Sequence, residues 1–263
     1  MREVKEIYLP TEDSFFLSEI LEKEILKLSN EKSEVKVLEI GCGSGIQLET
    51  MKNAAVNLGI ELGHSSVDVM KSMAEFGRVS KNPEDILRLA EVATIAGNVT
   101  TMTAQTAAQS MNTAMIAFKI NAKDSMDILD SWNEIQNNFR TTAEDLAEGI
   151  GKVGAVARQS GTSIEELEGY ITAINSATGI SGSESGTAIK SIISRIYRVG
   201  EEGVMDAGKA EEALTEIGVG VRNASGEFES AGKILNDLGE KWKTMSTIEK
   251  TALAQTVAGK MCA

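Results

Sequence analysis

The chain has 263 residues, of which 42% are hydrophobic and 4% aromatic, and it carries a formal net charge of −13 at pH 7. That length is enough for one large domain or two ordinary ones, with a real hydrophobic core. The excess of acidic residues argues against direct nucleic-acid binding and against docking on anionic lipid, since both require a basic surface.

Cysteine and histidine are too scarce to support several kinds of chemistry. The chain has two cysteines, Cys42 and Cys262, and one histidine, His64. We therefore expect a reducing compartment, no disulfide framework, no metal site and no histidine-based catalytic set. His64 is interpreted as a surface or helix-cap residue. No apolar run reaches the roughly 18 residues of a membrane span, and the N-terminus lacks the apolar stretch of a signal peptide.

Residues 1–50 carry both helix and strand signals. The apolar spacing over residues 12–28 predicts a helix, and residues 35–40 form a short β-branched run that predicts a buried strand. Glu39 lies at the end of that strand. Three alternating glycines then predict a tight loop whose backbone can approach a ligand closely: Gly41, Gly43 and Gly45.

Together with the sequence YLPTEDS at 8–14, this loop resembles the start of a class I S-adenosylmethionine-dependent methyltransferase, most closely the release-factor glutamine methyltransferase group. The resemblance implies that the glycine loop holds S-adenosylmethionine, with Glu39 beside it. Glu61 could supply the acidic residue that holds the cofactor ribose, although residues 59–62 fit a helix equally well. The family's Asn-Pro-Pro-Tyr substrate motif is absent, because no proline follows Pro83. The chain is therefore interpreted as more consistent with a non-enzyme, and an incomplete, inactive protein-glutamine methyltransferase is the alternative function.

The rest of the chain carries helix signals. Asn82 followed by Pro83 predicts a helix start, and apolar stripes predict helices around residues 111–118, 128–135 and 189–196. Capping boxes predict three further starts, at Thr141 with Glu144, Ser163 with Glu166, and Ser246 with Glu249. Glycine-rich joints are predicted at 149–154, 179–186, 200–208 and 218–226, and the last of these also predicts a small hairpin around Asn223–Gly226.

Several conspicuous side chains are interpreted as structural. Trp132 and Trp242 lie on apolar helical stripes and are predicted to anchor the core. The acidic pairs at 201–202 and 211–212 are predicted to be solvated helix starts. Four methionines are predicted to fill the core rather than to line a partner groove: Met102, Met111, Met115 and Met126.

The order of short segments after residue 50 carries a second resemblance. MKNAAV (51–56), LGIELG (58–63) and MAEFGR (73–78) are followed by AEDLAEG (143–149), GTSIEEL (161–167), GSESGTA (182–188), GEKW (239–242) and AGK (258–260). This order resembles the core region of phage tail tape measure proteins. The resemblance implies a structural role inside the growing tail tube, where the length of the chain sets tail length and a helix offers about 1.5 Å per residue as a ruler. It also implies self-association, tail tube and tail assembly proteins as partners, and a location in the virion tail or, during assembly, in the host cytoplasm.

These interpretations combine into one expectation. We expect a mainly α protein of multiple amphipathic helices with Gly-rich joints, packed through small residues and preceded by a short helix–strand–glycine-loop fragment of an α/β Rossmann-like fold. The predicted division is 1–50 for the methyltransferase-like fragment and 51–263 for the tape-measure core region. Such a chain is interpreted as a prophage fragment or a chimeric fusion of two reading frames, joined near residues 46–60. A generic helical interaction module remains a third interpretation.

Overall fold

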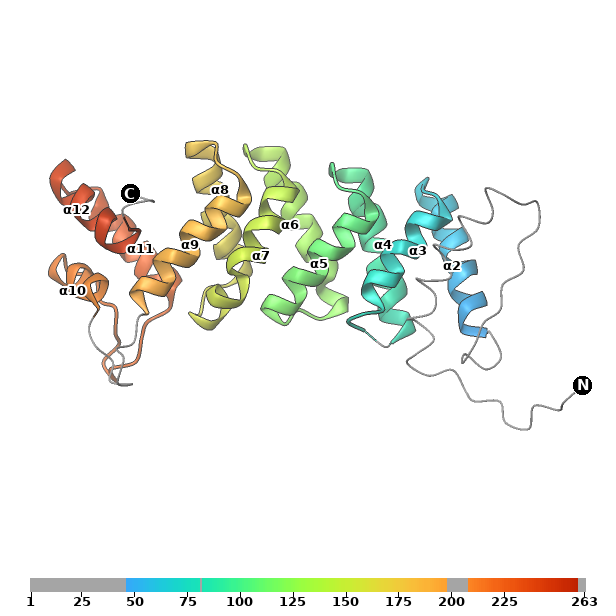
Figure 1. Ribbon diagram of the computed structural model, residues 1–263, viewed down its shortest axis with the longest axis horizontal. Coiled ribbons are helices and arrows are strands. Elements are labelled where there is room, and N and C mark those ends of the chain that lie inside the picture. The colour runs from blue at the N-terminus through green and yellow to red at the C-terminus, as the bar shows by residue number, and fades with distance from the viewer. Residues whose placement is uncertain (1–45, 81, 198–207, 260–263) are drawn as a thin grey trace, which may run out of the picture. The chain divides into compact units, whose positions relative to one another are not determined.

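The structure is a computed structural model that describes residues 46–80, 82–197 and 208–259 (Figure 1). Within these ranges the regular elements are helices, apart from one isolated β-bridge. The prediction of a mainly α protein is therefore confirmed. The strand at 35–40, the glycine loop and the acidic pair at 201–202 lie outside the described residues, so the Rossmann-like fragment stays a prediction.

The helices are short, between 8 and 17 residues apart from one turn of 3-10 helix, η1. In chain order they are α2 (Ile46–Leu62), α3 (Ser66–Phe76), α4 (Pro83–Val99), α5 (Ala104–Phe118), η1 (Ala122–Asp124), α6 (Ser125–Asn138), α7 (Ala143–Gln159), α8 (Ile164–Thr178), α9 (Gly182–Ile196), α10 (Lys209–Glu216), α11 (Ala231–Trp242) and α12 (Thr247–Val257).

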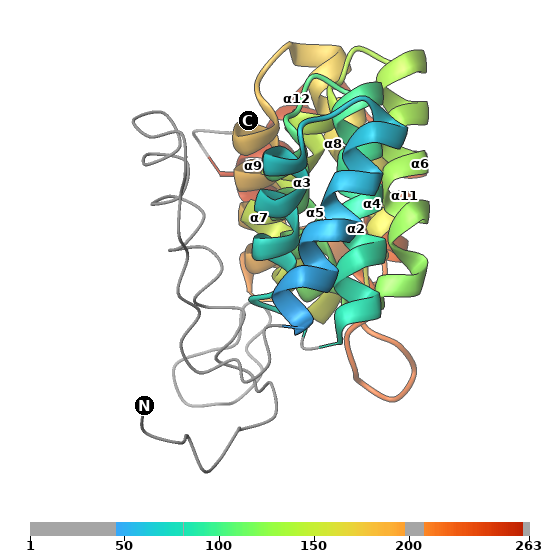
Figure 2. The same cartoon turned by 90° about the vertical axis from the view of Figure 1, so that its right-hand side faces the viewer.

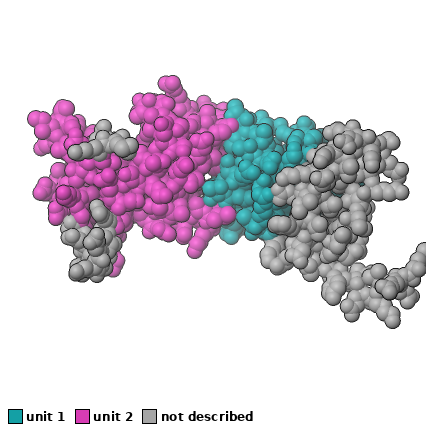
Figure 3. Space-filling model, viewed as in Figure 1, with its two compact units in different colours: residues 1–115, 120–130 teal, residues 116–119, 131–263 magenta. Residues whose placement is uncertain are grey.

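The chain forms two compact units (Figure 3). The first holds the described residues up to Met115 together with Ile120–Asp130, and the second holds Ile116–Lys119 and the residues from Ser131 onward. The predicted boundary at residue 50 stays a prediction, since residues 1–45 are not described.

In the first unit, α2, α3 and α4 pack on one another, as both Figure 1 and Figure 2 show. Its core combines a few large side chains, such as Phe76 and Leu89, with many alanines of α4 and α5. The small alanines leave room for flexible side chains. Met102, Met111 and Met115 are buried there, as predicted, whereas Met126 is half-buried.

The first unit also buries a carboxylate. Glu75 is only 6% exposed, and its side chain accepts hydrogen bonds from Gln105 Nε2 (3.2 Å), Gln109 Nε2 (2.8 Å) and Arg78 Nη1 (2.9 Å). A buried charge is tolerated when it is paired and hydrogen-bonded in this way. This glutamate therefore joins α3 to α5.

Most predicted helix starts are confirmed. The side chain of Asn82 accepts from Glu84 N, and Ser163 with Glu166 and Ser246 with Glu249 form complete capping boxes. The box predicted at Thr141 is wrong by one residue, because Thr142 caps α7 with Asp145 as its partner. In this register Thr141 is buried, and the apolar stripe of α7 faces the core.

The predicted glycine joint at 149–154 is wrong, because these residues lie inside α7. Gly182 and Gly186, predicted to lie in the next joint, belong to α9, which packs against α7. A Cβ added to Gly186 would lie 2.6 Å from the carbonyl oxygen of Gly149. These glycines therefore allow close helix contact, as the expectation of packing through small residues requires. Gly179, with φ of +74°, does end a helix as a joint residue.

The C-terminal part of the second unit is organised around the predicted hairpin. Arg222 and Phe228 form an antiparallel bridge, and Gly226 takes the left-handed conformation that the turn requires, with φ of +83°. The guanidinium of Arg222 donates to both carboxylate oxygens of Glu211, at 2.5 and 3.0 Å, and lies 4.1 Å from the centre of the Phe228 ring. The prediction that Glu211 is solvated is therefore wrong, since it is 9% exposed, whereas Glu212 is exposed.

This hairpin and its neighbouring helices enclose an apolar cluster, against which Trp242 packs while half-buried. The cluster contains the buried residues Ile196, Ala210, Leu214, Val219, Val221, Ile234, Leu253 and Val257. The side chain of Tyr197 packs against this cluster. Its hydroxyl donates to the carbonyl oxygens of Glu229 (2.5 Å) and Ser160 (3.2 Å). Burial, followed by the charge of Glu229, raises the pKa of Tyr197 to about 12, so the hydroxyl keeps its proton and remains a donor.

Candidate functional site

Of the site residues predicted from the methyltransferase resemblance, the structure describes Glu61 alone. Glu39, Gly41, Gly43 and Gly45 lie outside the described residues. Glu61 lies near the C-terminal end of α2 and is exposed, which is the helical one of its two interpretations. Its role beside a cofactor stays a prediction.

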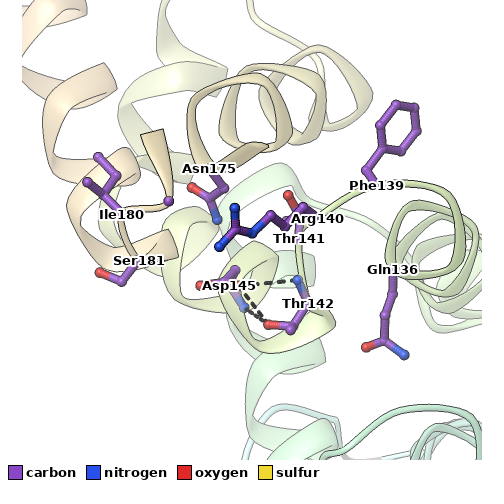
Figure 4. A pocket seen from close by; sticks show the side chains of 10 residues that line it. Gln136, Phe139, Arg140, Thr141, Thr142, Asp145, Asn175, Ile180 and Ser181 are labelled. Carbon is purple, nitrogen blue, oxygen red and sulfur yellow. Dashed lines mark hydrogen bonds between the residues drawn. The ribbon is translucent and has the colours of Figure 1, made fainter. Parts of the chain in front are cut away.

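The second unit contains a cavity of about 430 Å³, which we call the α6–α8 pocket (Figure 4). Its wall comes from the end of α6, the loop to α7, the first turn of α7, the end of α8 and the loop to α9. The lining residues are Gln136, Phe139, Arg140, Thr141, Thr142, Asp145, Asn175, Gly179, Ile180 and Ser181. Two helix starts and two helix ends therefore meet around this pocket.

The carboxylate of the pocket, Asp145, is fully engaged by the protein. Its side chain accepts from the hydroxyl (2.8 Å) and the backbone N–H (3.2 Å) of Thr142, and from the backbone N–H of Gly182 (2.8 Å). Partial burial acts to raise the pKa of Asp145, but these hydrogen bonds outweigh it and lower the pKa below its usual value. Asp145 therefore stays ionised and links the starts of α7 and α9.

The hydrogen-bonding capacity of Asn175 is only half used. Its side chain is 3% exposed, and its Oδ1 accepts from the hydroxyl of Ser185, but its Nδ2 has no partner among the described residues. The side chain of Thr141 is also 3% exposed, and its hydroxyl likewise has no hydrogen-bond partner among the described residues. Leaving a buried polar atom without a partner costs about 1–3 kcal/mol. The residues that line the pocket therefore include two whose unpartnered polar atoms are buried from solvent.

The rim of the pocket combines charge with apolar surface. Arg140 is exposed, and the part of the chain that the structure describes supplies no acid within salt-bridge distance of it. The Phe139 side chain is 57% exposed and that of Ile180 is 37% exposed. Figure 4 shows these two apolar side chains at opposite ends of the group of lining residues.

A second polar feature of this unit lies inside its core. The carboxylate of Glu168, on α8, is 2% exposed and accepts from Ser131 Oγ (2.6 Å) and Trp132 Nε1 (2.8 Å), both on α6. Burial, together with the charge of Glu165, raises the pKa of Glu168 to about 7, although the two hydrogen bonds oppose the shift. Trp132 is completely buried, as predicted, and its indole N–H has the partner that a buried tryptophan requires.

Sequence reasoning did not identify Arg140, Asn175 or Glu168. One usable signal was the pair Phe139-Arg140 directly between two helices, where an aromatic residue has no helical stripe to join. No comparable signal marked Asn175, because its partner Ser185 belongs to the next helix. Residue spacing alone does not show which polar side chains of a helical stripe become buried.

The described ranges offer no cluster of three or more metal-ligating side chains, and none of their helices is both long and apolar enough to cross a membrane. What the second unit does offer is a hydrogen-bonding pocket with an apolar rim. Over the described residues, fold and site together define a helical protein whose helices pack through small residues and engaged carboxylates.

Comparison with known proteins gives the family. Residues 52–259 match the family described as phage-related minor tail protein, and the chain belongs to that family. It is 24% identical over 197 residues, 73% of the chain, to the tape measure protein of Pneumococcus phage Dp-1. It is also 24% identical over 146 residues, 55% of the chain, to the probable tape measure protein of Escherichia phage P2. These alignments span 16% and 17% of the two relatives. No solved structure matches the chain.

Proposed function

We propose that this chain is the core region of a tape measure protein and acts as a structural component in the assembly and length determination of a phage tail. The observation that carries the proposal is the extent of the family match. It runs from residue 52 to residue 259 and so includes α3 to α12 entirely and most of α2. Both relatives are named as tape measure proteins, one of them as probable.

The architecture supports a role based on contact. Its helices begin at capping boxes and are held together by glycine and alanine contacts and by engaged carboxylates. For partners we propose further copies of this chain, tail tube proteins and tail assembly proteins, in the virion tail and, during assembly, in the host cytoplasm. The acidic balance of the chain supports protein rather than nucleic-acid partners.

Mass spectrometry of purified tails tests this proposal. Tails would be prepared from an induced lysate by gradient centrifugation and digested with trypsin, with the soluble fraction of the same lysate as the control. We expect peptides from residues 52–259 to be enriched in the tail fraction. Their confinement to the soluble fraction would contradict a structural role in the tail.

The methyltransferase interpretation of residues 1–50 remains an alternative proposal, supported by the Glu39-to-Gly45 motif together with the sequence YLPTEDS at 8–14. Calorimetric titration of the full chain with S-adenosylmethionine tests it. Micromolar binding that disappears in Gly43→Trp would support a working cofactor loop. Absence of heat in the wild-type chain would remove the alternative and leave the structural proposal unaffected.

A further inference from the structure

We propose that α8 is a proton-controlled element of the second unit: it stays packed while the Glu168 carboxyl is neutral, and it opens away from α6 and α9 more often when that carboxyl ionises. The inference goes beyond the proposed tail function and does not depend on it. It rests on three features of the described residues: a buried polar stripe along α8, a buried carboxyl without a cation beside it, and a left-handed glycine at each end of the helix.

The buried face of α8 carries the polar stripe. Glu168, Thr172 and Asn175 lie at positions i, i+4 and i+7, so they share one side of the helix. They are 2%, 7% and 3% exposed. Thr172 Oγ1 and Asn175 Nδ2 have no hydrogen-bond partner among the described residues. Each such atom destabilises the packed arrangement and gains water as a partner when the helix opens.

The packed position of Glu168 suits a neutral carboxyl. Its Oε1 accepts from Trp132 Nε1 (2.8 Å), and its Oε2 lies 2.6 Å from the Ser131 hydroxyl, which can accept the carboxyl proton as well as donate its own. A neutral carboxyl therefore satisfies both neighbours, whereas a buried carboxylate without a cation is costly. Burial, together with the charge of Glu165, accordingly raises the pKa of Glu168 to about 7.

The charged groups of the surrounding helices do not neutralise an ionised Glu168. On α8 the titratable neighbours are Glu165, Glu166 and Tyr170, and α6 carries the acids Asp127, Asp130 and Glu134. The charged side chains of α7 are Glu144, Asp145, Glu148, Lys152 and Arg158. Those of α9 are Glu184, Lys190 and Arg195. Among the described residues, none of these basic groups lies within salt-bridge distance of Glu168, and Arg158 donates instead to the Ala117 carbonyl oxygen (2.6 Å).

Glycine flanks α8 at both ends. Gly161, two residues before the N-cap Ser163, has φ of +73°, and Gly179, the C-cap, has φ of +74°. Glycine accepts a wide range of backbone angles, and the hinges of moving elements lie at a few terminal residues of this kind. The neighbouring helices α7 and α9 are joined directly, through Gly149 and Gly186. The structure therefore allows α8 to open while α7 and α9 stay together.

Linkage fixes the direction and the size of the effect. The packed state keeps the proton of Glu168 up to about pH 7, whereas the opened state loses it near the ordinary pKa of 4.5. Opening is therefore least favoured below pH 4.5, grows as the pH rises between these values and levels off above pH 7. The two pKa values correspond to an opening equilibrium that increases about 70-fold between pH 5 and pH 8.

Amide hydrogen exchange of the full chain at pH 5 and pH 8, corrected for the intrinsic exchange rates, tests the proposal. We expect the protection of the α8 amides to fall about 70-fold between these pH values and, at pH 8, to lie below that of the α7 amides. In Glu168→Gln the protection of α8 should be equal at the two pH values. Glu148→Gln makes the same change at an exposed position of α7 and should keep the wild-type behaviour.

Thr172→Val tests the polar stripe separately, because it replaces an unpartnered hydroxyl by a methyl group of similar shape. It should raise the protection of α8 at least about fivefold at both pH values and leave the pH dependence intact. Equal protection of α7 and α8 at pH 8, an undiminished fall in Glu168→Gln, or lower protection of α8 in Thr172→Val would each overturn the proposal. If Glu168→Gln does not fold, the wild-type comparison of α7 with α8 and the Thr172→Val variant still decide it.

Discussion

At the scale of single residues, Glu168 is the side chain whose ionisation is most closely tied to the fold. It connects α8 to Ser131 and Trp132 of α6 through two short hydrogen bonds, and its pKa is raised from 4.5 to about 7. In the unfolded chain the same carboxyl loses its proton near its ordinary pKa. Folded and unfolded states therefore bind different numbers of protons between about pH 4.5 and pH 7.

The sign of the effect follows from linkage. Between these pH values the folded state holds a proton that the unfolded state has lost, so the free energy of unfolding falls as the pH rises. A shift of this size corresponds to a loss of about 3 kcal/mol by pH 8. Replacing Glu168 by Gln keeps an acceptor for Trp132 and removes the titration. We predict that Glu168→Gln abolishes most of this loss, as measured by urea unfolding at pH 5 and pH 8 with tryptophan fluorescence.

The exposed Glu148 on α7 provides the control, because Glu148→Gln makes the same chemical change without burial. It should retain the wild-type pH dependence. A Glu168→Gln protein that loses as much stability between pH 5 and pH 8 as the wild type would show that this carboxyl does not control the effect.

Single residues also show where sequence reasoning reached its limit. The burial of Trp132 was predictable, because a large apolar side chain on a helical stripe has few other places to go. The burial of Glu211 was not, because its partner Arg222 lies 11 positions later on a different element. An acidic residue in the first turn of a helix is usually solvated, and only the tertiary contact reverses that expectation.

At the scale of elements, the contact between α7 and α9 is set by glycine. A Cβ added to Gly182 would lie far inside the van der Waals contact distance of the Asp145 carbonyl oxygen, and Gly149 and Gly186 approach each other in the same way. Backbone cannot move aside as a flexible side chain can, so the two helices would have to separate. The packing distance therefore depends on the absence of side chains at these positions.

We predict that Gly182→Ala destabilises the chain by about 2–3 kcal/mol, because overpacking at a rigid contact forces the backbone to shift. The matched control is Gly169→Ala on α8, where an added Cβ would meet nothing within 4 Å. That change should stabilise the protein by about 0.5–1 kcal/mol, since alanine is the better helix former. Thermal unfolding of the two variants decides the matter, and equal melting temperatures would contradict the role assigned to Gly182.

The contrast between caps and glycines shows what local sequence can specify. Ser163 and Ser246 were predictable as helix starts, because a capping box is complete within four residues. Glycine has two opposite uses, as a joint and as a close-contact surface, and its neighbours in sequence do not distinguish them. Gly149 was therefore assigned to a joint although it lies in the middle of α7. The α6–α8 pocket was also unpredictable from local sequence, because its walls come from separate helices.

At the scale of the whole molecule, charge is the dominant property. The chain has 39 acidic and 26 basic residues, and a surface of that balance repels phosphate. We predict that the purified chain does not retard a random-sequence DNA duplex in a gel-shift assay at low or moderate salt. Retardation that weakens as salt rises would reveal a phosphate-binding surface and would contradict the prediction.

The helix lengths bear on how such a region takes part in a tail. The longest described helices have 17 residues and so extend about 25 Å each. A region folded into short helices gains less length per residue than one continuous helix. We therefore expect this region, if it keeps this fold in the tail, to contribute less length per residue than a continuous helix would.

The most direct test of the central claim is the length of tails from a phage that carries an in-frame deletion of residues 52–259, measured by negative-stain electron microscopy. Supply of the intact gene in trans is the control for effects on neighbouring genes. The account predicts that tails are absent or abnormal in length without the region and normal when the gene is supplied. Tails of wild-type number and length in the deletion strain would contradict it.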